Sequence, residues 1–174
     1  MSVKTNPLAE FAYGAGLINP SKAPDPGLVY DLTVQDYVDF LCVLGYSQEK
    51  LDLITDNETK TTPCSSKSKN ETINNFNNPA IALLIEDPED FNGVFRRTVT
   101  NVGSPNSVYK AKVVTSSGLK VDVHPNVLSF TSLEEKKSFV VTLKGPIEKS
   151  NIVSASLVWD DGVFQVRIPI VVYF

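Results

Sequence analysis

The chain has 174 residues, of which 42% are hydrophobic and 21% charged; this composition excludes a wholly disordered protein and predicts one domain with some additional chain. Its longest apolar run, at 168–174, is far shorter than the roughly 20 residues of a membrane-spanning helix. A net charge of −4 argues against nucleic acid and anionic membranes as partners, because both favour a basic surface. We therefore expect no nucleic-acid and no membrane partner, and a protein or neutral surface instead.

The first 33 residues are rich in turn-forming residues and cannot form a domain alone. The interruptions are Gly14, Gly16, Pro20, Pro24, Pro26 and Gly27. Apolar residues are nevertheless too numerous for a free tail, namely Phe11, Tyr13, Leu17, Ile18, Leu28, Val29 and Tyr30. We expect them to lie against a surface, for which the rest of the chain offers no obvious match.

A short helical segment follows. Thr33 is a typical N-cap, with Asp36 in the first turn, and Gly45 is a typical stop. The apolar spacing between them predicts an amphipathic helix whose face is Tyr37, Phe40, Leu41 and Leu44. Ser47 can cap a second helix carrying Leu51 and Ile54, and the polar stretch 55–75 is typical of a linker.

The two cysteines, Cys42 and Cys64, occur with two glycosylation motifs, beginning at Asn57 and Asn70. Together they suggest a secreted chain with one disulfide and two glycan sites. A Cys42–Cys64 bond would close a loop of about 23 residues and contribute about 3 kcal/mol through loop-closure entropy. The segment that follows Met1 has no apolar signal-peptide core. Either the oxidising interpretation is wrong, or Met1 is not the true beginning.

The remainder alternates between apolar and polar residues, as half-buried strands do. The alternating sets are Phe95/Arg97/Val99, Tyr109/Ala111/Val113, Leu119/Val121/Val123, Phe139/Val141/Leu143 and Phe164/Val166/Ile168/Ile170, with further strands expected at 79–85 and 152–159. Turn signals separate them, including Asn92-Gly93 and His124-Pro125-Asn126, and Asp161-Gly162 is the strongest hairpin signal. Pro169 must take an edge or non-bonding position. About seven or eight strands in roughly 100 residues predict an antiparallel sandwich like immunoglobulin or fibronectin type III domains.

The sequence offers little catalytic chemistry. The single histidine, His124, precedes a proline at a strand end, where a loop imidazole is expected rather than a base; no Gly-x-Ser-x-Gly motif or zinc-ligand set accompanies it. The acidic stretch 86–90 lacks calcium-loop spacing and is expected to be a solvated loop. Trp159 is expected to pack in the core rather than bind sugar. We therefore predict no catalytic, cofactor-binding or metal-binding residue.

Several longer phrases resemble the C-terminal part of plant subtilisin-like serine proteases, the cucumisin-like subtilases, along the whole chain. They are Phe-Ala-Tyr-Gly-Ala-Gly-Leu-Ile-Asn-Pro at 11–20, Asp-Pro-Gly-Leu-Val-Tyr-Asp at 25–31, Asp-Tyr-Val-Asp-Phe-Leu-Cys at 36–42, Arg-Thr-Val-Thr-Asn-Val-Gly at 97–103 and Ser-Leu-Val-Trp at 156–159.

The resemblance implies a layout of three parts. Residues 1–33 would be the tail of a catalytic α/β subtilisin domain, 34–75 a helical, disulfide-bearing connector and linker, and 76–174 a fibronectin type III-like domain. Met1 would then be internal, with the secretory signal far upstream. The family's catalytic residues precede the stretch covered here, so none carries over.

Two positions depart from the family pattern. The family usually has His where Leu17 stands, and a Leu-Asn-Tyr-Pro-Ser phrase where this chain has residues 76–80, so the aromatic residue before Pro79 is missing. We expect weaker packing there.

The leading functional hypothesis is the C-terminal fragment of a secreted subtilisin-like serine endopeptidase, inactive alone, which supports its own catalytic domain and meets protein substrates only through the parent enzyme. The alternative is a free-standing extracellular interaction module. A hydrolase active in its own right is disfavoured by the missing triad.

Overall fold

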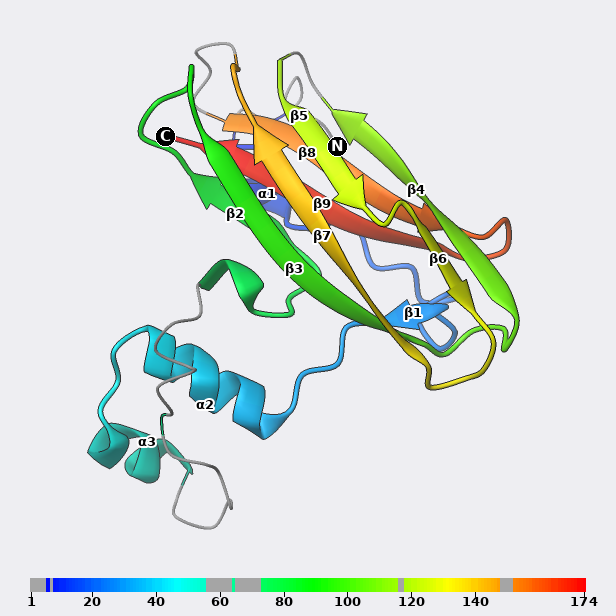
Figure 1. Cartoon of the computed structure of the whole chain (residues 1–174), viewed down its shortest axis with the longest axis horizontal. Coiled ribbons are helices and arrows are strands. Elements are labelled where there is room, and N and C mark those ends of the chain that lie inside the picture. Colours follow the sequence, from blue (N-terminus) through cyan, green and yellow to red (C-terminus); the bar gives the residue numbers. More distant parts are fainter. Residues whose placement is uncertain (1–5, 7, 56–63, 65–72, 116–117, 148–151) are drawn as a thin grey trace.

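Two β-sheets face each other across a shared apolar core, with all strands but one between residues 81 and 173 (Figure 1). The computed structural model describes residues 6, 8–55, 64, 73–115, 118–147 and 152–174. One sheet has the strand order β1 (Leu28–Val29), β3 (Asn92–Asn101), β7 (Lys136–Lys144) and β5 (Lys120–His124). The other has the order β2 (Ile81–Leu84), β9 (Gln165–Tyr173), β8 (Ile152–Asp160), β4 (Ser107–Thr115) and β6 (Val127–Phe130). All pairs are antiparallel except β2 with β9, which is parallel.

The core lies between the sheets. Alternate side chains of β7 and of most of β3 are buried there, and β9 adds Ile168, Ile170 and Val172 to the same cluster. Trp159 is fully buried, and its ring meets that of Phe139 edge-to-face, with 5.0 Å between centroids. Core packing was the prediction for this tryptophan, and it is confirmed. The mainly β sandwich predicted from the alternation is confirmed as well.

The strand predictions differ from the structure at three places. Strands β1 and β6 were not predicted, since each is too short to show alternation. Asn92-Gly93, predicted as a turn, instead begins β3 opposite Lys144 and Leu143. A Cβ at Gly93 would lie 2.6 Å from the end of the Leu83 side chain, so a larger residue there would require this leucine to move.

The hairpin predicted at Asp161-Gly162 is present between β8 and β9, with Gly162 at φ +92°. Asp160 fixes this hairpin by accepting hydrogen bonds from Lys112 Nζ at 2.7 Å, the Gly162 N–H at 2.8 Å and Gln165 Nε2 at 2.8 Å. These bonds, that from Lys112 first, lower the pKa of Asp160 from 3.8 to about 2.

The lowered pKa of Asp160 predicts a specific acid sensitivity. A carboxyl group with a lower pKa in the folded state stabilises the fold above its unfolded pKa, and this contribution disappears as the pH falls from about 4 to about 2. Asp160→Asn should therefore lower the free energy of unfolding at pH 7 and flatten its decline below pH 4. Denaturant unfolding at pH 7 and at a pH below 4 measures both effects. The control is Asp122→Asn, which changes an exposed acid on β5. An unchanged pH dependence in Asp160→Asn would contradict the prediction.

The segment 34–75, named here the connector, contains in its described residues α2 (Val34–Val43), α3 (Gln48–Thr55) and the short 3-10 helix η2 (Ile73–Asn75). Thr33 caps α2 as predicted: Thr33 Oγ1 accepts from the Asp36 N–H, and Asp36 accepts in return from the Thr33 N–H at 2.6 Å. Gly45, the predicted stop, has φ +85° just beyond the helix.

The predicted buried face of α2 is only partly correct. Val38 and Cys42 are buried, together with Leu51 of α3, in a small cluster separate from the sandwich core. Tyr37 and Phe40 instead contact Phe76, at 5.5 and 4.5 Å between ring centroids. The helix thus packs on two sides, which a single apolar stripe does not describe.

The structure joins Cys42 to Cys64, with 5.6 Å between their Cα atoms. Because this bond belongs to the connector cluster and not to the sandwich core, its removal should act locally. We expect Cys42→Ser/Cys64→Ser to lose about 3 kcal/mol of connector stability, seen as faster hydrogen exchange in α2 and α3. The main thermal transition should remain in place, and a large shift in it would contradict the prediction.

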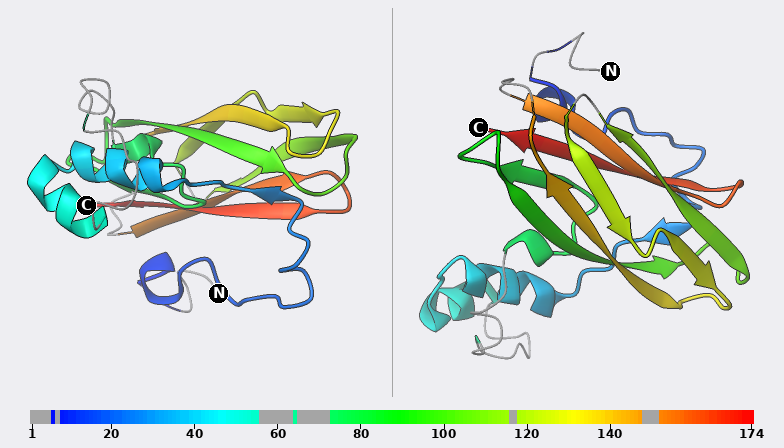
Figure 2. Two further views of the ribbon diagram at one scale, coloured as in Figure 1. Left: turned by 90° about the horizontal axis from the view of Figure 1, so that it is seen from below. Right: turned by 45° about the horizontal axis from the view of Figure 1, so that its top comes forward.

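The first part of the chain forms an arm, defined as residues 8–31, that includes α1 (Glu10–Tyr13) and β1. Figure 2 (left) shows α1 beyond the β8–β9 layer, on the side facing away from β3 and β7. The arm then reaches the other sheet, where β1 pairs with the end of β3. None of the helices in the described ranges is sufficiently long and apolar to cross a membrane.

Candidate functional site: the junction of arm, connector and strand β3

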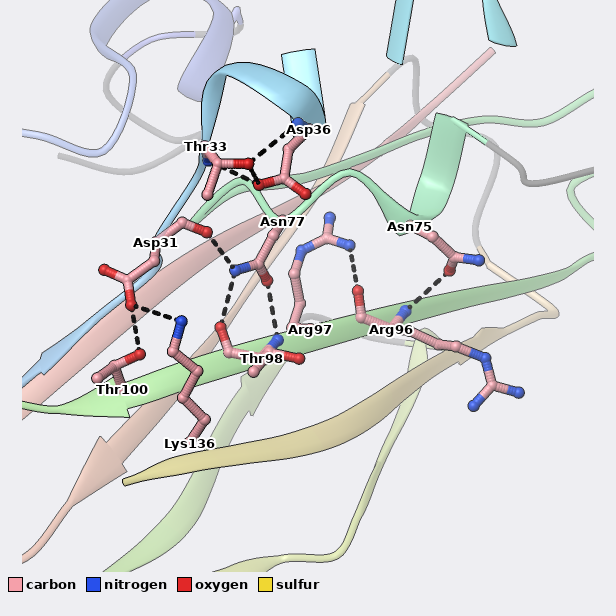
Figure 3. Close-up of a pocket in the computed structure, with 10 residues that line it drawn as sticks. All are labelled: Asp31, Thr33, Asp36, Asn75, Asn77, Arg96, Arg97, Thr98, Thr100 and Lys136. Carbon is pink, nitrogen blue, oxygen red and sulfur yellow. Dashed lines mark hydrogen bonds and ion pairs between the residues drawn. The ribbon is translucent and has the colours of Figure 1, made fainter. Parts of the chain in front are cut away.

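The arm, the connector and strand β3 meet in a polar cleft of about 370 Å³ (Figure 3). Residues 31–36 form one wall, residues 75–77 a second, and the outer face of β3 with Lys136 of β7 the third. Three segments that are distant in sequence are thus joined at one place, and the hydrogen bonds that join them define the site.

Asn77 binds the open edge of β3 as a neighbouring strand would. Its Oδ1 accepts from the Thr98 N–H at 2.8 Å, and its Nδ2 donates to the Thr98 carbonyl at 2.9 Å and to the Asp31 carbonyl at 3.2 Å. One residue pair further along β3, Asn75 Oδ1 accepts from the Arg96 N–H at 3.2 Å. These side-chain amides therefore replace a missing strand at this edge.

Asp31 forms the second connection. Thr100 Oγ1 donates to its Oδ2 at 2.5 Å, and Lys136 Nζ lies 3.4 Å from the same oxygen. The hydrogen bond from Thr100, followed by the contribution of Lys136, lowers the pKa of Asp31. A carboxylate with a lowered pKa is a poor general base, so this Thr–Asp pair is suited to joining segments rather than to activating a nucleophile.

Arg97 is the central side chain of the junction, only 4% exposed although charged. It points inward at the side of the sandwich where β3 and the segment before β2 meet, and its guanidinium lies 5.7 Å from the Phe95 ring. Burial lowers its pKa to about 10, which leaves it charged at neutral pH. Its hydrogen bonds all go to main-chain carbonyls, those of Asn74 at 2.5 Å, Asn78 at 2.8 Å, Arg96 at 2.8 Å and Ala80 at 3.2 Å.

Tyr30 and Leu28 extend the junction into the sandwich core. Leu28 is buried in the main cluster, and Tyr30 packs against it. Burial raises the pKa of the Tyr30 hydroxyl, while Arg97 acts in the opposite direction. The expectation that the chain offers no obvious match for these apolar residues is therefore wrong for Leu28 and Tyr30, since the open side of the sandwich accommodates them.

The phrase 97–103 has a structural role at nearly every position. After Arg97, Thr98 and Thr100 comes Asn101, which is fully buried. Asn101 Nδ2 donates to the carbonyls of Ser104 at 2.7 Å and Ser132 at 3.1 Å, which joins two loops at one end of the sandwich. Alternation identified the strand, but these roles were missed, because a period of two does not distinguish an inward arginine from a surface one.

The other residues considered from sequence lie away from this cleft. His124 is exposed at the end of β5, and the acidic stretch 86–90 forms the loop between β2 and β3, where Glu89 N–H donates to Asp87 Oδ1. Pro169 pairs with Ser156 of β8, whereas the pairing of β9 with β2 begins one residue later, at Ile170. On the side that faces β2, Pro169 therefore has no strand partner. The glycosylation motifs at Asn57 and Asn70 lie outside the described residues.

The departure from the family phrase at 76–80 also has a structural context. Residues 76–80 precede β2 rather than forming a strand, and the Asn78 side chain is exposed while its carbonyl accepts from Arg97. The aromatic ring of Phe76 packs on α2. Weaker packing in this segment stays a prediction.

The sequence profile of the fibronectin type-III domain matches residues 75–172. The chain belongs to this family. Among solved structures, a FixG-related protein from Vibrio parahaemolyticus aligns with a TM-score of 0.41 and 11% identity, over 48% of this chain and 79% of that one.

This fibronectin type-III chain is also homologous to the C-terminal region of plant subtilisin-like proteases. Subtilisin-like protease SBT4.6 of Arabidopsis thaliana is 49% identical over 97% of this chain and 23% of that protein. Subtilisin-like protease SBT4.3 of the same organism is 45% identical over 99% of this chain and 23% of that protein. The chain thus spans about a quarter of the length of these curated relatives, and the resemblance seen in the sequence is confirmed.

Arg97 allows a direct test of the junction. Arg97→Gln should leave several carbonyls without donors and lower the free energy of unfolding by about 3 kcal/mol. The neighbouring Arg96→Gln removes the same charge from an exposed side chain and should change it by less than about 0.5 kcal/mol. Urea unfolding of both variants measures the difference. Equal effects would show that Arg97 has no special role in joining the segments.

Proposed function

We propose that this chain is the C-terminal, non-catalytic part of a secreted subtilisin-like serine endopeptidase, which supports the stability and activity of its catalytic domain and is inactive alone. The observation that carries the proposal is the continuity of the arm, junction and sandwich within a chain that is homologous to proteases over 97% of its length. The arm is joined to the fibronectin type-III domain by the hydrogen bond from Thr100 to Asp31 and by the packing of Tyr30 on the core, so the sandwich can hold the polypeptide that leads into it.

In this proposal, residues 1–33 are the end of the catalytic domain, 34–75 the connector and 76–174 the supporting domain. The partner is the chain's own catalytic domain, and protein substrates are met only through the parent enzyme. The disulfide between Cys42 and Cys64 supports an extracellular location, because such bonds persist in oxidising compartments.

A chimera with SBT4.6 tests the supporting role. Three secreted proteins are compared, namely SBT4.6, SBT4.6 in which this chain replaces the homologous region, and SBT4.6 without that region. We expect the chimera to be secreted and to hydrolyse a peptide substrate, and the deletion form to lose most of its secreted activity. A deletion form as active and heat-stable as the complete protease would overturn the proposal.

The isolated chain tests the non-catalytic character. Incubated with a broad peptide substrate and a fluorophosphonate probe, it should show neither hydrolysis nor labelling, while SBT4.6 serves as the positive control. Labelling of any serine in the isolated chain would overturn this part of the proposal.

A further inference from the structure

The outer face of the sheet formed by β3, β7 and β5 carries a row of positive side chains. Lys136 and Lys144 point outward from the two ends of β7. Arg96 points outward from β3 and pairs with Val140, midway between these lysines. Because a strand rises about 3.4 Å per residue, the three cations follow the strands at intervals of about 13 Å. Together with Lys120 of β5 they are named here the cationic stripe.

Lys120 adds a like-charged neighbour to one end of the stripe. It pairs with Lys144 across the β5–β7 ladder, so the two side chains leave the sheet from adjacent strands. Both are exposed, and within the described part of the chain no ion pair involves Lys120, Lys144 or Arg96. Like charges directly opposite each other in a sheet are destabilising. A bound anion would relieve this repulsion.

Acidic groups are few on this face. Among the outward positions that the structure describes in β3, β5 and β7, Asp122 is the only acid. Lys136 is the one member of the stripe with a carboxylate beside it, that of Asp31 at 3.4 Å. Further acids lie beyond the two ends, in the loop 86–90 before β3 and at Asp36 in the cleft. The net charge of −4 describes the whole chain, whereas this face is positive.

Small polar side chains occupy positions between the cations. The hydroxyl oxygens of Thr98 and Ser138 lie 2.8 Å apart on neighbouring strands, in the row between Lys136 and Arg96. Thr142 holds the corresponding position before Lys144. Hydroxyl groups can both donate and accept hydrogen bonds, as the hydroxyls of a sugar do. The face therefore combines spaced cations with groups that suit a carbohydrate.

We propose that the cationic stripe binds a linear acidic polysaccharide, an extended polymer whose sugar units carry carboxylates. The polymer lies along β3 and β7, with its carboxylates at the stripe and its hydroxyls at Thr98 and Ser138. In Figure 1, β3, β7 and β5 lie in front of β8 and β9, and in Figure 2 (left) α1 is on the opposite side of the sandwich. The inference goes beyond the proposed function, from which it takes only the extracellular location.

The arrangement of charges favours a thin polymer over other anionic partners. A bilayer or a nucleic-acid duplex is broad, so it would also meet the acids beyond the ends of the stripe, in the loop 86–90 and at Asp36. A single polysaccharide chain can remain on the strands and avoid them. The disulfide between Cys42 and Cys64 is typical of oxidising, extracellular surroundings, which favours a polysaccharide over nucleic acid.

Binding of the whole chain to immobilised polygalacturonate, a linear polymer of a uronic acid, tests the inference. We expect binding at low salt that weakens as NaCl is added, because salt screens exposed charges. Arg96→Gln/Lys144→Gln should lower the affinity about tenfold, and Asp122→Asn should raise it. The matched control, Lys22→Gln/Lys110→Gln, removes the same charge from two exposed lysines outside this face and should change the affinity less than about twofold.

Three results would overturn the inference. The first is the absence of binding to polygalacturonate at low salt, or binding that salt does not weaken. The second is an equal loss of affinity in Arg96→Gln/Lys144→Gln and in the control pair, which would show attraction without a defined site. The third comes from phosphatidylserine vesicles and duplex DNA, measured in parallel. If either binds as tightly as polygalacturonate and depends equally on the stripe, the polysaccharide is the wrong partner.

The variants also separate binding from folding and from the proposed function. All changed side chains are exposed, so each variant should keep the melting temperature of the parent chain. If Arg96→Gln/Lys144→Gln nevertheless melts lower, Asp122→Asn decides, and an unchanged affinity in that variant overturns the inference. The assay uses the isolated chain and no peptidase activity. Its failure would therefore leave the result of the SBT4.6 chimera unaffected, and the reverse is equally true.

Discussion

For most of its length β3 is the edge of its sheet, and the N–H and C=O groups on its open side must find partners. Unpaired N–H and C=O groups at a strand edge destabilise the fold when other parts of the protein cover them. When they are exposed, they can pair with strands of other molecules. Here the partners come from two segments, residues 75–77 and the arm. Arg96 is bonded to Asn75, Thr98 to Asn77, and Val102 N–H to the Gly27 carbonyl at 2.9 Å, while β1 pairs with the segment between. The arrangement of arm and connector on the sandwich follows from this single requirement.

The need for hydrogen-bond partners applies also to the buried side chain of Arg97, next to the open edge of β3. A buried cation is expensive to desolvate, and a carboxylate partner is the usual compensation. In this chain the four hydrogen bonds of Arg97 end on carbonyls from residues 74–80 and from Arg96. These carbonyls belong to an irregular segment that lacks its own ladder, so the arginine and the segment satisfy each other. The guanidinium, with donors on three nitrogens, suits such a task better than an ammonium group would.

The sequence predicted what depends on local rules. The period of two found five of the strands, and two more were expected at 79–85 and 152–159. The capping chemistry of Thr33 and Gly45 found the limits of α2. It did not reveal the junction, because the bonds of Asn77, Asp31 and Arg97 depend on segments brought together only by the fold. The phrases 25–31 and 97–103 carried the resemblance as separate stretches. In the structure they contact each other, through Gly27 with Val102 and Asp31 with Thr100.

Strand β1 shows where the folding unit begins. The matched fibronectin type-III segment starts at residue 75, yet β1 lies at 28–29, and Leu28 is buried in the sandwich core. A sandwich that began at residue 75 would lack the Leu28 side chain in its core, and the strand edge at Thr100 and Val102 would be unpaired. Open edges recruit strands from other molecules, so such a piece would be prone to aggregation. A processing event that separated the arm from the sandwich would therefore also produce an insoluble remnant.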